Sequence, residues 1–148
     1  MTAGPTSSAW QQTARLLGWL GVLPFVLMLA IAWTGGPKWL VDLVVGYGVL
    51  ILAFMGGTLW AGAMERSKEP QPPLLASNLI VLAALPALLL PLGSATLLLA
   101  VLFTLHWLAE KIWIEHAQAG WYRRMRTAIS AVVIILLVIT SVVYFSAL

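Results

Sequence analysis

The chain alternates long apolar segments with short polar ones. Apolar residues fill five blocks, at 16–33, 39–64, 74–90, 95–114 and 127–148. Each block reaches or approaches the roughly 20 residues that an α-helix needs to cross a hydrocarbon core about 30 Å thick. The last block is rich in Val and Ile but does not alternate apolar with polar residues, which favours a helix over a strand. The pattern predicts an all-α integral membrane bundle of five transmembrane helices.

Polar or helix-breaking segments separate the predicted helices. Residues 34–38 hold two Gly and one Pro and predict a tight turn, whereas 65–73 combine four charges with three prolines and predict a hydrophilic linker. Residues 1–15 are small and polar, so we expect a surface segment there and a single five-helix domain over 16–148. Pro24, inside the first predicted helix, indicates a kink packed against protein.

Composition supports this assignment and excludes several classes of function. Apolar residues make up 61% of the 148 residues and charged residues only 9%, against about 25% charged in soluble domains. The mean hydropathy is +0.98. Because there is no Cys, disulfides, thiol catalysis, iron–sulfur ligation and Cys-ligated zinc are excluded. The net charge of +3 comes from a few basic residues in loops and indicates membrane orientation rather than nucleic-acid binding.

The basic residues are distributed asymmetrically between the two sides. With the N-terminus inside, only Lys38 lies outside, and the other basic residues fall in cytoplasmic segments: Arg15, Arg66, Lys68, Lys111, Arg123, Arg124 and Arg126. Cytoplasmic loops carry the excess of Lys and Arg. We therefore predict a multi-pass protein of a bacterial inner (plasma) membrane, with the N-terminus inside and the C-terminus outside.

The fourth predicted helix carries an intramembrane polar site, composed of His106, Glu110 and Lys111. If this helix enters near Ala95, His106 lies roughly 16 Å deep, near the midplane, and Glu110 follows one turn later on the same face. Such a pair can relay a proton, because imidazole titrates near neutral pH. The structural alternative is a neutral, hydrogen-bonded His106, with Glu110 paired to Lys111 or to a loop arginine.

The second predicted helix carries a stripe of small residues. Ala53, Gly57 and Ala61 recur every four residues, with Gly56 and Trp60 beside them. Small residues at this spacing let two membrane helices approach closely. We interpret the stripe as a helix-packing motif within the chain, with Gly57 against another helix; a pore lining and a homodimer seam are the alternatives. Asp42, close to the outer boundary, is expected to pair with Lys38.

Catalysis finds little direct support in the sequence. His106 and His116 are ten residues apart on consecutive turns, so they do not clamp one haem iron from opposite sides. The chain contains no phosphate loop, nucleotide fingerprint, zinc-protease signature or serine nucleophile elbow. We therefore predict no catalytic residue, no metal and no cofactor.

Two segments resemble motifs of a known family. Residues 54–60, Phe-Met-Gly-Gly-Thr-Leu-Trp, are similar to a Phe-Leu-Gly-Gly-x-x-Trp motif. Residues 121–127 resemble a Trp-Tyr-x-x-Leu-Arg loop before the last helix, and give a basic cytoplasmic loop here with Trp121, Tyr122, Arg123, Arg124 and Arg126. Together with Tyr47-Gly48, they resemble an uncharacterised multi-pass family typified by mitochondrial transmembrane protein 69, over nearly the whole chain from Leu17 onward. The chain has Leu59 where many relatives carry His or Arg, and Ala61 where they carry Gly.

The resemblance implies a membrane protein class without supplying an activity. Two functions remain from the sequence: a noncatalytic accessory or assembly partner of a larger membrane complex, and a small transporter or proton-conducting channel that uses His106 and Glu110. We favour the first, because intramembrane polar residues are too sparse to line a hydrophilic pathway. The expected partners are the lipid bilayer and either another membrane protein or further copies of the chain, without nucleic acid.

Single cysteines at Ser67 and Ser146 test the predicted orientation, because the chain has no Cys of its own. An impermeant thiol reagent applied to intact cells should label the Ser146→Cys variant and spare the Ser67→Cys variant until the membrane is broken. Labelling at position 67 but not at 146 would refute the orientation.

Overall fold

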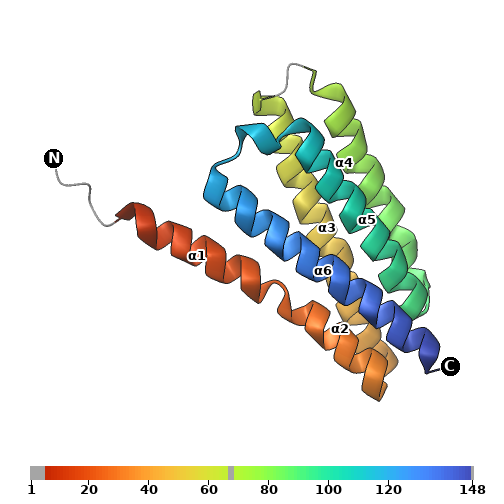
Figure 1. Cartoon of the computed structure of the whole chain (residues 1–148). Helices are drawn as coiled ribbons and strands as arrows, with labels where there is room; N and C mark the ends of the chain where they lie inside the picture. Colours follow the sequence, from red (N-terminus) through yellow and green to blue (C-terminus); the bar gives the residue numbers. More distant parts are fainter. Residues whose placement is uncertain (1–5, 67–68, 148) are drawn as a thin grey trace.

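In a computed structural model, the chain folds into a bundle of long helices (Figure 1). The structure describes residues 6–66 and 69–147, so Ser67 and Lys68 lie outside the described residues. The α-helices and the two short 3₁₀ helices, η1 and η2, follow in chain order: α1 Thr6–Leu20, α2 Leu23–Thr34, α3 Lys38–Arg66, α4 Gln71–Ala84, η1 Leu85–Leu89, α5 Leu92–Trp113, η2 Glu115–Ala117 and α6 Gly120–Ser146. No strand occurs within the two described ranges.

Five stretches are long and apolar enough to cross a membrane. They are Ala9–Thr34, Lys38–Glu65, Gln71–Leu89, Leu92–Trp113 and Gly120–Ser146. The prediction of an all-α protein with five such helices is confirmed, and the organisation is that of a multi-pass membrane protein.

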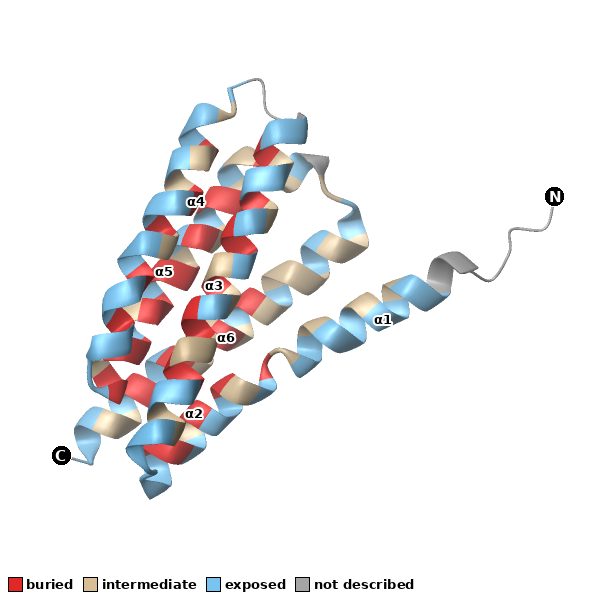
Figure 2. Cartoon of the chain, turned by 180° about the vertical axis from the view of Figure 1, so that it is seen from behind, coloured by how far each residue is buried: buried red, intermediate tan, exposed pale blue. Residues whose placement is uncertain are grey.

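The span Leu92–Trp113, which is α5, lies at the centre of the bundle. Of its apolar stretch 56% is buried, against 28–39% for the other four. It packs against α3, α4 and α6, while α2 lies against α3 and α6. Figure 2 shows the buried positions on the inward faces of these helices. Phe103 of α5 is fully buried and meets Phe25 of α2 edge to face, with ring centroids 5.7 Å apart.

The first span is broken into two helices at Gly21 and Val22 rather than gently kinked. Pro24 has no N–H, and Phe25 N–H donates to the Val22 carbonyl, so the Gly21 carbonyl has no helical partner. The Tyr47 hydroxyl of α3 donates to that carbonyl at 2.9 Å. The predicted kink at Pro24 is thus a break in the helix, and α3 packs against it and satisfies the Gly21 carbonyl. Beyond the break α1 diverges from the bundle (Figure 1), and none of its residues 9–20 is buried.

The last helix begins seven residues earlier than predicted, at Gly120 instead of 127. The predicted basic loop with Trp121, Tyr122, Arg123, Arg124 and Arg126 is therefore wrong as a loop, because these residues form the first two turns of α6. Arg and Met are good helix formers. Helical packing of Trp121 and Tyr122, with ring centroids 5.7 Å apart, is compatible with this extension. The connection to α5 runs instead through η2.

The first and third predicted helices also begin earlier in the chain than predicted. Helix α1 starts at Thr6, so most of the predicted polar segment 1–15 is helical, and residues 1–5 lie outside the described residues. Helix α4 starts three residues before the predicted start at 74, with prolines in its first turn, where the missing N–H costs nothing. Near Pro86 the α-helix gives way to η1.

The prediction of a helix-packing motif on α3 is only partly correct. Gly56 is buried against α4, and a Cβ added there would lie 2.9 Å from Val81 and 3.5 Å from the Ser77 carbonyl. Gly57 is exposed, with no other helix within 4 Å of such a Cβ. The expectation that Gly57 lies against another helix of this chain is therefore wrong. Trp60 and Ala61 are also exposed and Ala53 is half-buried, because α3 turns the Gly56 side to its neighbours.

A close contact between α5 and α6 lies at Gly93. A Cβ at this glycine would lie 2.5 Å from the Tyr144 ring. The Ser141 hydroxyl donates to the Gly93 carbonyl at 2.9 Å across the same interface. Any larger residue at this position would force the Tyr144 ring or α6 to shift.

Gly93→Ala should therefore lower the thermal unfolding midpoint of the purified protein in detergent, since overpacking a tight interface costs about 1–3 kcal/mol. Gly57→Ala is the matched control, because its methyl group would meet nothing, and its midpoint should equal or exceed that of the wild type. Both midpoints can be followed by circular dichroism. A greater loss for Gly57→Ala than for Gly93→Ala would contradict the observed packing of α3.

Candidate functional site

The two polar residues predicted on one face of α5 both point into the bundle. His106 is fully buried and Glu110, one turn later, is 5% exposed. Their burial agrees with the four-residue spacing, which places both side chains on the same stripe of the helix. Ionisable groups at this depth require partners, because a charge left alone in an apolar interior is costly.

Glu110 finds its partner on α6. The Arg126 guanidinium lies 2.5 Å from the Glu110 carboxylate, and the side chains are only 14% and 6% exposed. Arg126 Nη2 also donates to the Thr58 hydroxyl of α3 at 3.2 Å. Thr58 in turn donates to the Met55 carbonyl at 2.7 Å. A charge-assisted chain of hydrogen bonds thus joins three helices.

His106 completes this group, which we call the buried polar cluster: the Met55 carbonyl, Thr58, His106, Glu110 and Arg126. The imidazole lies close to the Met55 carbonyl and to both charges. Neither ring nitrogen has a hydrogen-bond partner of normal geometry among the described residues. His106 is therefore enclosed by the cluster without forming a regular hydrogen bond to any of its members.

Lys111 was predicted in the same site but lies outside it. Its ammonium contacts the Glu115 carboxylate at 3.1 Å and stacks over the Trp107 ring, 4.8 Å from the centroid. Arg123 approaches the same carboxylate at 3.8 Å. Of the two partners considered for Glu110, Lys111 is thus excluded and the arginine is chosen, although it lies in a helix rather than a loop.

Sequence reasoning missed Thr58 and did not identify which loop arginine would pair with Glu110. Thr58 and Arg126 each lie in one of the two motif segments, 54–60 and 121–127, and these segments meet at the Arg126–Thr58 contact. The joint occurrence of the motifs was the available signal. Leu59, where the resemblance expects a polar residue, is fully buried beside Ala109 in the same α3–α5 interface.

The cluster has the composition of a structural charge pair rather than of a metal centre. Within the described ranges, no group of three or more His, Cys, Asp or Glu side chains could hold a metal ion. The single carboxylate here already lies against an arginine. What the arrangement does chemically is neutralise one negative charge inside the bundle.

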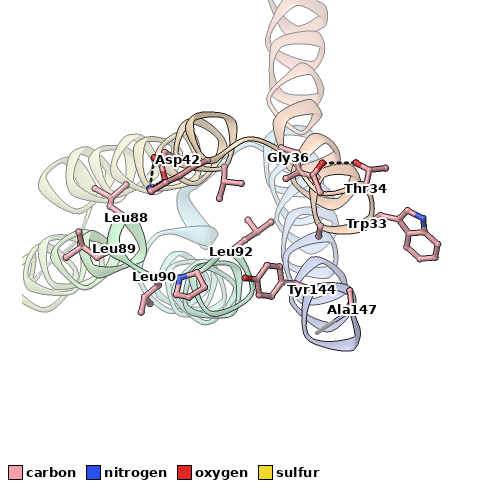
Figure 3. Close-up of a pocket in the computed structure, with 16 residues that line it drawn as sticks. Trp33, Thr34, Gly36, Asp42, Leu88, Leu89, Leu90, Leu92, Tyr144 and Ala147 are labelled. Carbon is pink, nitrogen blue, oxygen red and sulfur yellow. Dashed lines mark hydrogen bonds and ion pairs between the residues drawn. The ribbon is translucent and has the colours of Figure 1, made fainter.

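A larger cavity, of about 770 Å³, lies at the opposite end of the bundle (Figure 3). Leu88, Leu89 and Leu92 line it together with Tyr144. Its charged residues neutralise each other, since Lys38 Nζ lies 2.8 Å from Asp42, as predicted. The cavity is open and mostly apolar, and offers no obvious reactive group.

The buried ion pair of Glu110 and Arg126 should stabilise the fold more than the exposed pair of Glu115 and Arg123. Arg126→Gln leaves Glu110 buried without its cation, and breaking such a pair costs about 3–5 kcal/mol, so the thermal midpoint in detergent should fall strongly. Arg123→Gln is the control: its side chain is 46% exposed, and such a contact is worth at most about 1 kcal/mol. The double variant Glu110→Gln/Arg126→Gln should recover part of the loss. Equal midpoints for the two single variants would show that the buried pair does not stabilise the fold.

Comparison with known proteins gives a family without an activity. No curated protein and no solved structure matches the chain. The model of one family matches residues 10–142, nearly the whole chain and all of the buried polar cluster. The further likeness to mitochondrial transmembrane protein 69 stays a prediction from the motifs. The chain therefore belongs to the family described as "Protein of unknown function (DUF3429)".

Proposed function

We propose that this protein is a noncatalytic membrane partner, an accessory or assembly factor that binds another integral membrane protein through the exposed face of α3. The observation that carries the proposal is the open position of Gly57, in the middle of a helix whose other side is packed. The polar interior of the protein supports the bundle, and the exposed face supplies the contact.

The exposed face of α3 has a shape suited to a second helix. Gly57 and Ala61 form a shallow strip along it, and the larger Phe54 and Trp60 flank the strip, with 69% and 46% of their surface exposed. In a bilayer, helices associate through close van der Waals packing of small residues, since lipid tails remove the hydrophobic drive. A strip between two aromatic side chains gives a partner helix both close approach and lateral contact.

The interior argues against the alternative, a proton-conducting channel. The cavity lined by Glu110 measures about 10 Å³, roughly the space of one water molecule. His106 is fully buried, and Glu110 is held against Arg126. A conducting relay needs a continuous chain of water or titratable groups, and the cluster offers a closed pair instead.

The proposed setting is a bacterial inner membrane with the N-terminus inside. The asymmetry of Lys and Arg supports this orientation. It brings the α5–α6 connection and the first turns of α6 to the cytoplasmic side, and Lys38 with Asp42 to the other. The proposed contact face of α3 then lies within the bilayer.

A photocrosslinking amino acid at Gly57, incorporated in living cells, tests the proposal. It should give one discrete adduct of higher mass, whereas the same group at Leu79, exposed on α4, should give none. Gly57→Leu should abolish an adduct formed from Ala61, because the strip is then filled, without lowering the thermal midpoint. An adduct of twice the chain mass would show that the partner is a second copy of this chain rather than another membrane protein. Equal crosslinking from positions 57 and 79 would refute the proposal.

A further inference from the structure

A second cavity system lies where α1 passes α6, at the end of the bundle that holds the α5–α6 connection. A cavity of about 330 Å³ is lined there by two arginines, two tryptophans and one methionine: Arg15, Trp19, Trp121, Arg124 and Met125. We propose that this cavity binds the phosphate headgroup of an anionic glycerophospholipid, and that one acyl chain of the lipid lies in the adjoining groove between α1 and α6.

The two arginines bring positive charge that the protein does not neutralise. The other two arginines of α6 that precede residue 127 have carboxylate partners, Arg123 with Glu115 and Arg126 with Glu110. Within residues 6–66 and 69–147, neither Arg15 nor Arg124 forms an ion pair with a carboxylate. A cavity holding two such guanidinium groups suits a phosphate, which accepts bidentate hydrogen bonds from arginine.

Aromatic side chains hold one of these arginines in place. The Arg15 guanidinium lies over the Trp121 ring, 5.6 Å from its centroid. Trp10 packs edge to face on the same ring at 5.5 Å. Tryptophan is enriched where the headgroups meet the hydrocarbon, since its ring is amphipathic. The stacking lowers the freedom of Arg15 and leaves its donors available to a ligand.

An apolar groove continues from this cavity toward the middle of the bundle. It has a volume of about 320 Å³, shares Met125 with the charged cavity, and is lined by residues of α1, α2, α3, α5 and α6, among them Leu17, Gly18, Phe54, Phe103 and Val133. From Met125 to Val133 the helix rises about 12 Å, the length of several methylene groups. The groove therefore points along the direction of an acyl chain whose phosphate lies at Arg15 and Arg124.

Charge and shape together select the ligand. Two cations without a carboxylate partner favour an anionic over a zwitterionic lipid, and basic pockets between membrane helices bind such headgroups. A free phosphate would use the cavity alone and leave the groove empty. This inference is independent of the proposed partner at α3, because the two surfaces share only Phe54.

Native mass spectrometry of the whole protein in detergent, titrated with phosphatidylglycerol or phosphatidylcholine, tests the site. Wild type should retain phosphatidylglycerol preferentially. Arg15→Gln/Arg124→Gln should bind it roughly tenfold to thirtyfold more weakly, at about 1 kcal/mol per cation. Arg15→Lys/Arg124→Lys should keep the preference, and Lys38→Gln, which removes a basic residue from the opposite end, should bind like wild type. Equal binding by wild type and the double Gln variant, with the folded state verified by circular dichroism, would overturn the proposal.

Two further measurements distinguish binding of a lipid from binding of free phosphate at this site. Ala14→Phe narrows the groove while both arginines are kept, and should weaken phosphatidylglycerol binding. Inorganic phosphate at millimolar concentration should fail to displace the lipid, because it lacks the acyl contact. Displacement by phosphate, together with unchanged lipid binding by Ala14→Phe, would overturn the lipid assignment.

Discussion

The bundle depends on one buried ion pair. Glu110 and Arg126 face each other across α5 and α6, and each would be costly in an apolar interior without the other. The pair fixes the rotation of both helices, since neither side chain has another buried partner of opposite charge. Through Thr58 and the Met55 carbonyl it also holds the register of α3. Apolar helix surfaces alone can pack in several registers. The polar atoms of the interior thus specify how the helices are aligned.

A second consequence of the pair concerns His106. The histidine lies one turn from Glu110, yet its nitrogens lack partners of normal geometry among the described groups. Because Arg126 already compensates the carboxylate, nothing in the cluster requires a protonated imidazole. A neutral His106 therefore fits the closed interior, although the regular hydrogen bond expected in the structural interpretation is not formed.

Much of the fold follows from the sequence because the bilayer imposes strong limits. Length and hydropathy predict the five spans, and helical spacing predicts that His106 and Glu110 share a buried face and that Lys38 meets Asp42. The sequence offered a loop arginine as one partner for Glu110, but which arginine it is, and that it lies in a helix, did not follow. The polar character of residues 120–126 resembles that of an interhelical connection, whereas in the structure these residues form the first turns of α6 and bring Arg126 to Thr58. Nor did the sequence indicate which of Gly56 and Gly57 is buried: adjacent residues are about 100° apart on a helix, and periodicity does not identify the neighbour.

The break at Gly21 gives the molecule two different widths. On one side of it α2 lies within the bundle, and on the other α1 leans away (Figure 1). A single phenolic hydroxyl, that of Tyr47, bridges the joint to α3. In the proposed membrane setting, the helices therefore occupy a larger cross-section on the α1 side of Gly21 than on the α2 side, so the two leaflets surround different widths of the protein.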